Sequence, residues 1–227
     1  GYKVSGGLHG VGISVVNGLS EWLVAEVYRN GKIYRQSYKK GITDSELEIV
    51  GESDHTGTII QFMPDATIFD DIVFDYKTLE TRLRELAFLN KGVRIVFEDK
   101  RPGQEQKKEF LYDVGIREFI EYLNSTKTPI HENVVYIDKK IQDCMVEIAI
   151  QYTDGYSENI LSFANNIDTH EGGAHLAGFK AALTKTVNEY AKRNKLLKEN
   201  DANLSGEDIR EGITAVVSVK LPDPQFE

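Results

Sequence analysis

A glycine-rich turn runs directly into a helical pattern at the start of the chain, and this feature constrains the fold most. Glycines stand at positions 6, 7, 10 and 12, and apolar residues recur at helical spacing over residues 11–19. The first N–H groups of a helix have no partner within the helix, and glycines without a Cβ let an oxyanion approach them closely. The segment therefore predicts a phosphate-binding loop, which points to a nucleotide ligand.

The order of the glycines excludes the two commonest phosphate loops. Read as Gly-x-x-Gly-x-Gly over residues 7–12, the order reverses the dinucleotide fingerprint, and no Lys-Ser or Lys-Thr follows as a P-loop requires. A tight turn without a ligand is the alternative explanation, and a glycine cluster alone does not exclude it.

The complete string over residues 2–12, Tyr-Lys-Val-Ser-Gly-Gly-Leu-His-Gly-Val-Gly, carries more information than its glycines. It resembles the segment after the ATP lid in the ATPase (B) subunits of bacterial type II DNA topoisomerases, the family that includes gyrase and topoisomerase IV. More distant members of that ATPase superfamily keep the glycines but lack the string. The further blocks that resemble this family, in its order, are 56–58, 83–90, 121–124, 127–131, 172–175 and 217–224.

The resemblance implies an α+β fold in two domains. Residues 1–113 would form the C-terminal part of a GHKL-type (Bergerat) ATPase sandwich, and residues 114–227 a transducer domain truncated before its Gln-Thr-Lys loop. It also implies a βαβ crossover of the rare left hand in the transducer, whereas the pattern alone would indicate a right-handed one. A polar, loop-like stretch from Lys100 to Lys108 fits a boundary near Asp113.

Hydrophobic patterns and turn residues predict the elements of the first half. An Asn30-Gly31 turn joins two strands, because both positions of such a turn need positive φ. A helix over 77–90 would carry the pair Glu80 and Arg84 on its outer side. Strands are expected at 22–29, 32–38, 47–50, 58–62 and 93–98. The first four would form an antiparallel sheet.

In the second half of the chain, the same patterns predict three helices and four strands. A short amphipathic helix covers 116–123, and a longer one begins near His175 and buries an apolar face that includes Tyr190. Ser205 and Asp208 would cap a short helix. The strands expected here cover 134–137, 145–152, 159–164 and 213–221, with Asp154-Gly155 turning the second toward the third.

The resemblance assigns site residues one by one. The nucleotide-binding residues that it implies are Tyr2, Lys3, Leu8, His9, Gly10, Val11, Gly12 and Thr58. His9 would lie beside the phosphates and assist binding rather than acid–base catalysis, while Thr58 would support adenine recognition from a central strand. Arg29 matches an arginine at the pocket rim that contacts aminocoumarin inhibitors. Without the resemblance, Thr58 indicates β-branched packing and Arg29 a solvated turn.

No catalytic and no metal-binding residue is assigned within this chain. The resemblance places the catalytic glutamate, the asparagine that holds Mg²⁺ and the adenine-reading aspartate before Gly1, and the γ-phosphate lysine after Glu227. We therefore expect the segment alone to be inactive, because bound phosphate without a base and metal leaves the barrier nearly intact.

The resemblance also implies what the parent protein does. ATP binding would dimerise the B subunits over a DNA duplex, with the gyrase A subunit as partner in an A2B2 heterotetramer, and ATP hydrolysis would drive strand passage that introduces negative supercoils. Two alternatives stay open. One is a topoisomerase IV B subunit, which decatenates; the other is a nucleotide-sensing interaction module without turnover.

Two further clusters have plain explanations that we favour. His170 and His175 stand five residues apart with two glycines between them, which does not match the zinc-protease spacing of four. We expect that segment to lead into the long helix. The basic series Lys180, Lys185, Lys192, Arg193, Lys195 and Lys198 indicates a solvated helix face, with a DNA-facing track as the alternative.

Composition sets the remaining bounds. The chain has 227 residues, 41% hydrophobic and 28% charged, which suits one large or two modest domains. A net charge of -9 argues against a protein that coats nucleic acid, although a local basic face is compatible with it. Cys144 is the single cysteine, and no stretch has the roughly 18 apolar residues of a membrane span, so we expect a cytoplasmic protein.

Overall fold

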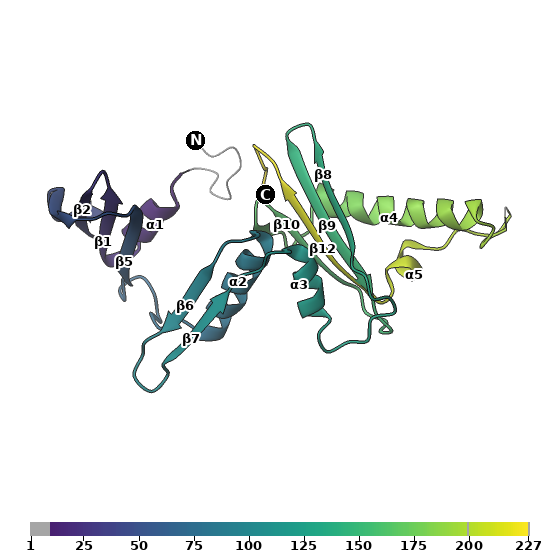
Figure 1. Ribbon diagram of the computed structural model, residues 1–227, viewed down its shortest axis with the longest axis horizontal. Helices are drawn as coiled ribbons and strands as arrows, with labels where there is room; N and C mark the ends of the chain where they lie inside the picture. Colours follow the sequence, from purple (N-terminus) through teal and green to yellow (C-terminus); the bar gives the residue numbers. More distant parts are fainter. Residues whose placement is uncertain (1–9, 199, 227) are drawn as a thin grey trace. The chain divides into compact units, whose positions relative to one another are not determined.

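The structure, a computed structural model, describes residues 10–198 and 200–226. Backbone contacts divide these residues into two compact units, one ending at Asp75 and the other beginning at Tyr76 (Figure 1). This division concerns packing alone. The boundary near Asp113 concerns the functional domains and stays a prediction.

The first unit is an antiparallel sheet preceded by a short helix. The elements are α1 (Gly12–Gly18), β1 (Ser20–Arg29), β2 (Lys32–Lys39), β3 (Ile42–Thr43), β4 (Glu48–Glu52) and β5 (Gly57–Pro64). The sheet runs in the order β3-β2-β1-β5, and β4 pairs with the first part of β2. Asn30 and Gly31 have φ of 55° and 76°, which confirms the predicted turn between β1 and β2.

The second unit is built around a five-stranded sheet with helices on both faces. Its helices are α2 (Tyr76–Leu89), α3 (Ile116–Leu123), α4 (Ala174–Arg193) and α5 (Gly206–Arg210). Its strands are β6 (Ile95–Asp99), β7 (Gln106–Phe110), β8 (Val135–Ile141), β9 (Cys144–Tyr152), β10 (Asn159–Ala164), β11 (Ile167–Asp168) and β12 (Ile213–Lys220). The five-stranded sheet has the order β11-β10-β12-β9-β8, while β6 and β7 form a separate hairpin.

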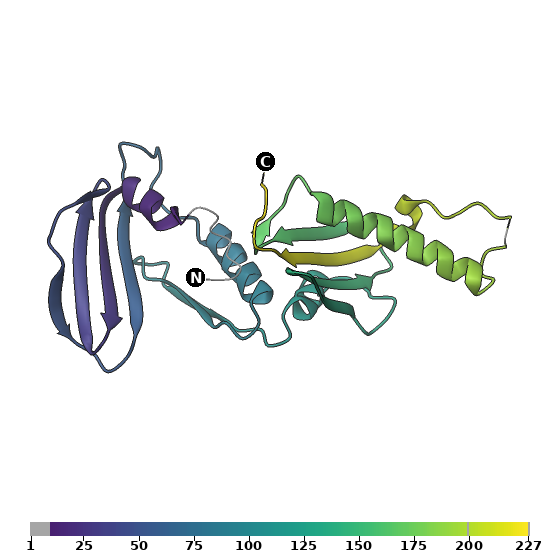
Figure 2. The same cartoon turned by 90° about the horizontal axis from the view of Figure 1, so that it is seen from above.

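Strand β12 lies at the centre of this sheet, and its side chains alternate between two cores. Ala215 and Val217 point toward Phe179 of α4, which lies along that face of the sheet in Figure 2. Val216 belongs to the opposite core, where Phe88 of α2 and Phe119 of α3 pack in parallel with ring centroids 4.7 Å apart. The last helix of the predicted ATPase domain thus shares a hydrophobic core with the predicted transducer.

The chain passes from β10 through α4 to β12, and β10 and β12 pair in parallel. This confirms a βαβ crossover, while its left hand stays a prediction. The two helices predicted at 116–123 and from near His175 are present as α3 and α4, and Ser205 accepts the Asp208 N–H in the predicted cap.

Several sequence-based expectations were wrong. Glu80 is 8% exposed rather than on the outer side of its helix, because Arg84 and Lys108 both bond its carboxylate. Tyr190 is 54% exposed, and Asn188 and Ala191 are the buried residues at that end of α4.

Two topological expectations also need correction. Part of the stretch predicted as a loop over 100–108 belongs to β7, whose polar sequence hid a strand that pairs with β6. Asp154-Gly155 does not turn β9 onto β10 as sheet neighbours, because β12 lies between those two strands.

Candidate functional site

The described end of the glycine turn, from Gly10, leads directly into α1. Gly10 has φ of 64°, Val11 caps the helix, and the Val15 N–H donates the first helical bond to the Val11 carbonyl at 2.8 Å. The N–H groups of the first turn, from Gly12 on, therefore have no acceptor within the helix. A Cβ at Gly10 or Gly12 would meet no atom within 4 Å among the described residues, so both glycines face open space on that side.

Four of the predicted nucleotide-binding residues cannot be placed. Tyr2, Lys3, Leu8 and His9 lie outside the described residues. Gly10, Val11 and Gly12 are the part of the predicted loop that the structure describes, and their assignment to a nucleotide stays a prediction.

Asp65 fixes the end of α1 to the sheet. Its backbone N–H donates to the Leu19 carbonyl at 3.0 Å, and its carboxylate accepts bonds from the Thr67 hydroxyl at 2.7 Å and the Thr67 N–H at 2.9 Å. The Lys40 ammonium lies 2.9 Å away. Together the Thr67 bonds and then the Lys40 cation lower the pKa of Asp65 to about 2, so the carboxylate is charged under ordinary conditions.

An apolar pocket of about 310 Å³ lies beside α1. Its lining residues are Val16, Leu19, Ser20, Phe62, Pro64, Phe69, Asp71, Ile72, Val73 and Phe74. Next to Val16 on α1, the side-chain Oδ1 of Asn17 is buried and has no hydrogen-bond partner among the described residues. The only signal in the sequence for this buried group is a polar residue within the apolar helical pattern.

Thr58 and Arg29 lie near the turn end of the first sheet. Thr58 pairs with Val27, and Arg29 faces Lys32 across the hairpin; both side chains are exposed. The expectation of a central strand for Thr58 is wrong for the described sheet, where β5 is an edge strand. Since α1 joins β1 at Ser20, Thr58 and Arg29 lie at the other end of a strand about 30 Å long.

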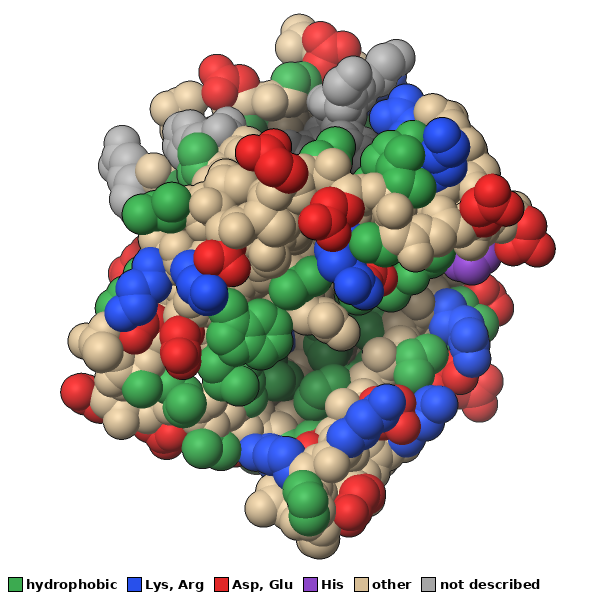
Figure 3. All heavy atoms as spheres, turned by 90° about the vertical axis from the view of Figure 1, so that its left-hand side faces the viewer, with side chains coloured by type: hydrophobic (Ala, Val, Ile, Leu, Met, Phe, Trp, Pro, Cys, Tyr) green, Lys and Arg blue, Asp and Glu red, His purple; other side chains and the backbone are tan. Residues whose placement is uncertain are grey.

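Strand β5 also exposes apolar side chains on both of its faces. Ile59 is 41% exposed and Ile60 is 38% exposed, although successive side chains of a strand point to opposite sides. Figure 3, which looks at the side of the molecule where this sheet is drawn in Figure 1, shows hydrophobic side chains among the charged ones. A half-buried sheet would show one polar face, so this part of the sheet is unlike an ordinary solvated surface.

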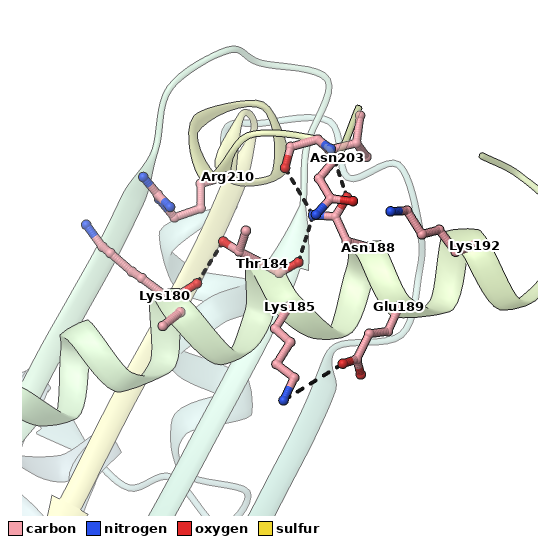
Figure 4. A pocket seen from close by; sticks show the side chains of 10 residues that line it. Lys180, Thr184, Lys185, Asn188, Glu189, Lys192, Asn203 and Arg210 are labelled. Carbon is pink, nitrogen blue, oxygen red and sulfur yellow. Dashed lines mark hydrogen bonds and ion pairs between the residues drawn. The ribbon is translucent and has the colours of Figure 1, made fainter. Parts of the chain in front are cut away.

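Three residues of the basic series, Lys180, Lys185 and Lys192, line a groove of about 550 Å³ between α4 and the segment that leads into α5 (Figure 4). Glu158 accepts from Lys180 at 2.6 Å and from Arg210 at 2.8 Å, and Lys185 lies 3.8 Å from Glu189. Carboxylates thus neutralise part of this positive charge. The choice between a solvated face and a DNA-facing track stays open, with the solvated face favoured.

His170 and His175, in the segment that leads into α4, have different surroundings. Gly172 and Gly173 have φ of 85° and 138°, and α4 begins at Ala174, as expected for a segment that starts the helix. The His175 ring lies 3.2 Å from the Thr169 hydroxyl, and burial lowers its pKa, while His170 is exposed beside Asp168.

Comparisons with known proteins agree with this fold. A family model described as DNA gyrase B matches residues 115–227. The gyrase B protein of Enterococcus faecalis is 55% identical over all of this chain and 36% of its own length. That of Bacillus mycoides is 54% identical over all of this chain and 56% of its own length.

Solved structures give the same result. The 43K ATPase domain of Thermus thermophilus gyrase B, in complex with an aminocoumarin, is 41% identical with a TM-score of 0.83, covering 96% of this chain and 60% of that one. The topoisomerase IV ATP-binding domain of Francisella tularensis is 27% identical with a TM-score of 0.79, covering 96% and 59%. The chain spans about a third of the length of curated relatives such as that of Enterococcus faecalis.

Proposed function

The chain belongs to the DNA gyrase B family, and we propose that it forms part of the ATP-binding domain and most of the transducer in a type II DNA topoisomerase. The observation that supports this proposal is the glycine turn at the N-terminus of α1, where the N–H groups of the first helical turn have no acceptor within the helix and Gly10 and Gly12 face open space. Residues 1–113 would belong to the ATP-binding domain and residues 114–227 to the transducer. The family model, which begins at residue 115, supports that boundary.

The proposed ligand is ATP, held by the backbone N–H groups of Gly10, Val11 and Gly12 and by the preceding residues from Tyr2 to His9. A role of Thr58 toward the adenine rests on the family resemblance alone, since Thr58 lies beside the end of β1 that is far from its junction with α1. The family resemblance places the Mg²⁺ ligand outside this chain. Separately, residues 10–198 and 200–226 hold no group of three or more His, Cys, Asp or Glu side chains arranged around a metal. Hydrolysis would depend on residues outside this chain.

In the parent protein, ATP binding would dimerise two B subunits around a DNA duplex, and hydrolysis would reset them. With the gyrase A subunit in an A2B2 assembly, this cycle would pass one duplex through another and introduce negative supercoils. Such a protein would act in the cytoplasm. Within the described part of the chain, no helix is both long and apolar enough to cross a membrane.

Calorimetry on the parent protein tests the nucleotide assignment. We expect a non-hydrolysable ATP analogue to bind the wild type, and Gly10→Val to weaken binding by tenfold or more, about 1.4 kcal/mol. Gly103→Val is the matched control, because Gly103 also has a positive φ of 76° and open space around its Cβ position, but lies in the β6–β7 turn. Absence of binding to the wild type would overturn the proposal; equal binding by Gly10→Val would overturn the role of the loop.

Two assays on the reconstituted parent separate the alternatives. Negative supercoiling of relaxed plasmid supports gyrase, whereas decatenation without supercoiling supports topoisomerase IV. DNA-stimulated ATP turnover excludes a nucleotide-sensing module that does not hydrolyse. Gyrase is favoured, since the curated relatives named above are gyrase B proteins that are 54–55% identical over all of this chain.

A further inference from the structure

A two-residue turn between β10 and β11 uses asparagines where glycines would suit the backbone. Asn165 and Asn166 have φ of 49° and 65°, and the flanking residues Ala164 and Ile167 pair across the hairpin. Glycine adopts this conformation freely, whereas asparagine only tolerates it. Asparagine also occupies such a position in the β1–β2 turn, at Asn30, but the side chains of Asn165 and Asn166 make contacts beyond their turn, which the turn itself does not require.

Asn165 holds the exit of the central strand. Its Nδ2 donates to the Leu221 carbonyl at 2.9 Å, and its Oδ1 accepts the Leu221 N–H at 2.8 Å. Its own N–H donates to the Val219 carbonyl at 2.8 Å, and the residue is 2% exposed. The side-chain amide thus acts as one more peptide group, which continues the strand pairing past the end of β12 and fixes where the chain leaves the sheet.

Asn166 faces the other way, toward α2. Its carbonyl accepts from Arg82 Nη2 at 2.8 Å, and its Nδ2 donates to Asn90 Oδ1 at 3.0 Å. Asn90 is in turn fixed to the end of α2, because its Nδ2 donates to the Leu86 carbonyl at 2.7 Å. These bonds join residues 76 and 84 positions apart in sequence, so they belong to tertiary structure and not to the local turn.

The Asn166 side chain is not optimal for stability. Its Oδ1 is buried and has no hydrogen-bond partner among the described residues, and a buried acceptor without a partner is unfavourable. Glycine at this position would remove the unpaired acceptor and the positive-φ strain, and with them the bond to Asn90 Oδ1. A residue that is locally unfavourable but makes a specific contact is characteristic of a functional position.

We propose that the pair Asn165 and Asn166, here called the asparagine joint, is a positioning element that couples α2 to the exit of β12. The inference rests on the proposed function, in which α2 lies in the ATP-binding domain and β12 in the transducer. A shift of α2 on nucleotide binding would reach Leu221 through Asn90, Asn166 and Asn165. The joint holds no ligand and takes no part in the chemical step.

The chain offers a matched control in α4. Asn188 holds Leu204 by the same reciprocal bonds, donating to its carbonyl at 3.0 Å and accepting its N–H at 2.8 Å, and is 5% exposed. Its bonds lie within the predicted transducer and involve no part of α2. Loss of the Asn188 bonds therefore has the same cost in stability as loss of the Asn165 bonds, while the asparagine joint stays intact.

The test compares Asn165→Gly, Asn166→Gly and Asn188→Ala in the parent protein reconstituted with its A subunit. The readout is the ratio of DNA-stimulated to basal ATP turnover, with hydrogen exchange of the Leu221 amide as a structural check. We expect both joint variants to lower the ratio about fivefold or more, a typical allosteric coupling, while Asn188→Ala keeps the wild-type ratio. Asn166→Gly should do so with a melting temperature no lower than that of Asn188→Ala, which loses more hydrogen bonds; a purely structural role would not lower the ratio in Asn166→Gly and leave it unchanged in Asn188→Ala.

The outcomes separate this inference from the proposed function. A wild type without ATP turnover contradicts the function itself. A wild type that responds to DNA, with an unchanged ratio in Asn166→Gly, overturns the joint and leaves the function standing. If Asn165→Gly does not fold, Asn90→Ala approaches the joint from α2 and is expected to lower the ratio as Asn166→Gly does.

Discussion

Gly212 lies against the backbone of Thr153: a Cβ added at Gly212 would stand 2.6 Å from the Thr153 carbonyl oxygen and 2.7 Å from that of Gly155. The Gly212 carbonyl accepts the Thr153 N–H at 2.9 Å, so the two segments are bonded at the point of closest approach. Gly212 also has φ of 76° and directly precedes β12. The central strand can begin here only because this residue has no side chain.

We therefore expect Gly212→Ala to destabilise the second unit strongly. A positive φ alone costs alanine about 1–2 kcal/mol, and the clash with two backbone oxygens adds to it because backbone cannot rotate away. Gly103→Ala has the same φ of 76° with no atom within 4 Å, so it isolates the first contribution. Urea unfolding of both variants measures the difference, and equal losses would show that the close approach carries no cost.

Local signals in the sequence were sufficient where structure is set by neighbouring residues. The Asn30-Gly31 turn and the Ser205 cap need only nearby groups, and the structure has both. The polar segment Gln106–Phe110 is a strand only through its pairing with β6, and the position of β12 between β9 and β10 depends on segments far apart in the chain. Such pairings leave no local pattern to detect.

The candidate site divides in the same way. The open glycines at positions 10 and 12 are a local property of the loop, and the sequence predicted them as such. Thr58 was placed on a strand correctly, but its position at the sheet edge depends on which strands pair. The asparagine joint could not be predicted, because its partners Arg82 and Asn90 are distant in sequence.

Acid should weaken the anchor of α1 through Asp65. The pKa of Asp65 is about 2 in the folded protein, below that of an unfolded aspartate near 3.9, so the carboxylate stabilises the fold above pH 4. We expect Asp65→Asn to lower the melting temperature at pH 7. That difference from the wild type should shrink as the pH falls from 4 toward 2, because the unfolded state then takes up the proton first.

Thermal melts of the wild type and Asp65→Asn across this pH range measure the effect. Asp70→Asn is the control, since Asp70 is exposed in the same connection and makes the same change of charge. A difference that does not depend on pH would show that the Thr67 bonds act through shape rather than charge.

The ion pair between Lys91 and Glu147 should matter more than a surface pair. Burial would raise the pKa of Glu147, but hydrogen bonds from Lys91 at 2.8 Å and from Tyr136 at 2.6 Å outweigh it and hold that pKa below its usual value. The Glu147 side chain is 13% exposed. Lys91→Met leaves the carboxylate buried without its cation, so we expect a loss of about 1–3 kcal/mol.

Lys100→Met is the control for this change, because Lys100 is 78% exposed and lies 3.7 Å from Glu98 at the surface. Its loss should stay below about 1 kcal/mol. Chemical unfolding of both variants, together with Glu147→Gln in a double-mutant cycle, measures the coupling between Lys91 and Glu147. A coupling as small as that of the exposed pair would contradict a role for burial.

Arg29 should affect inhibitor binding but not nucleotide binding. It ends β1 with an exposed side chain, and the proposed function places it at the rim of the ATP pocket, where an aminocoumarin binds in the family. We expect Arg29→Ala to weaken an aminocoumarin about tenfold, since hydrogen bonds to a charged group contribute about 1.5–3 kcal/mol. The affinity for an ATP analogue should stay within about twofold, because a rim side chain does not contact the phosphates. Lys32→Ala is the control, because it removes the cation directly across the hairpin and should change neither affinity. Calorimetry measures both variants. Equal effects would mean that general positive charge, and not the Arg29 guanidinium, attracts the inhibitor.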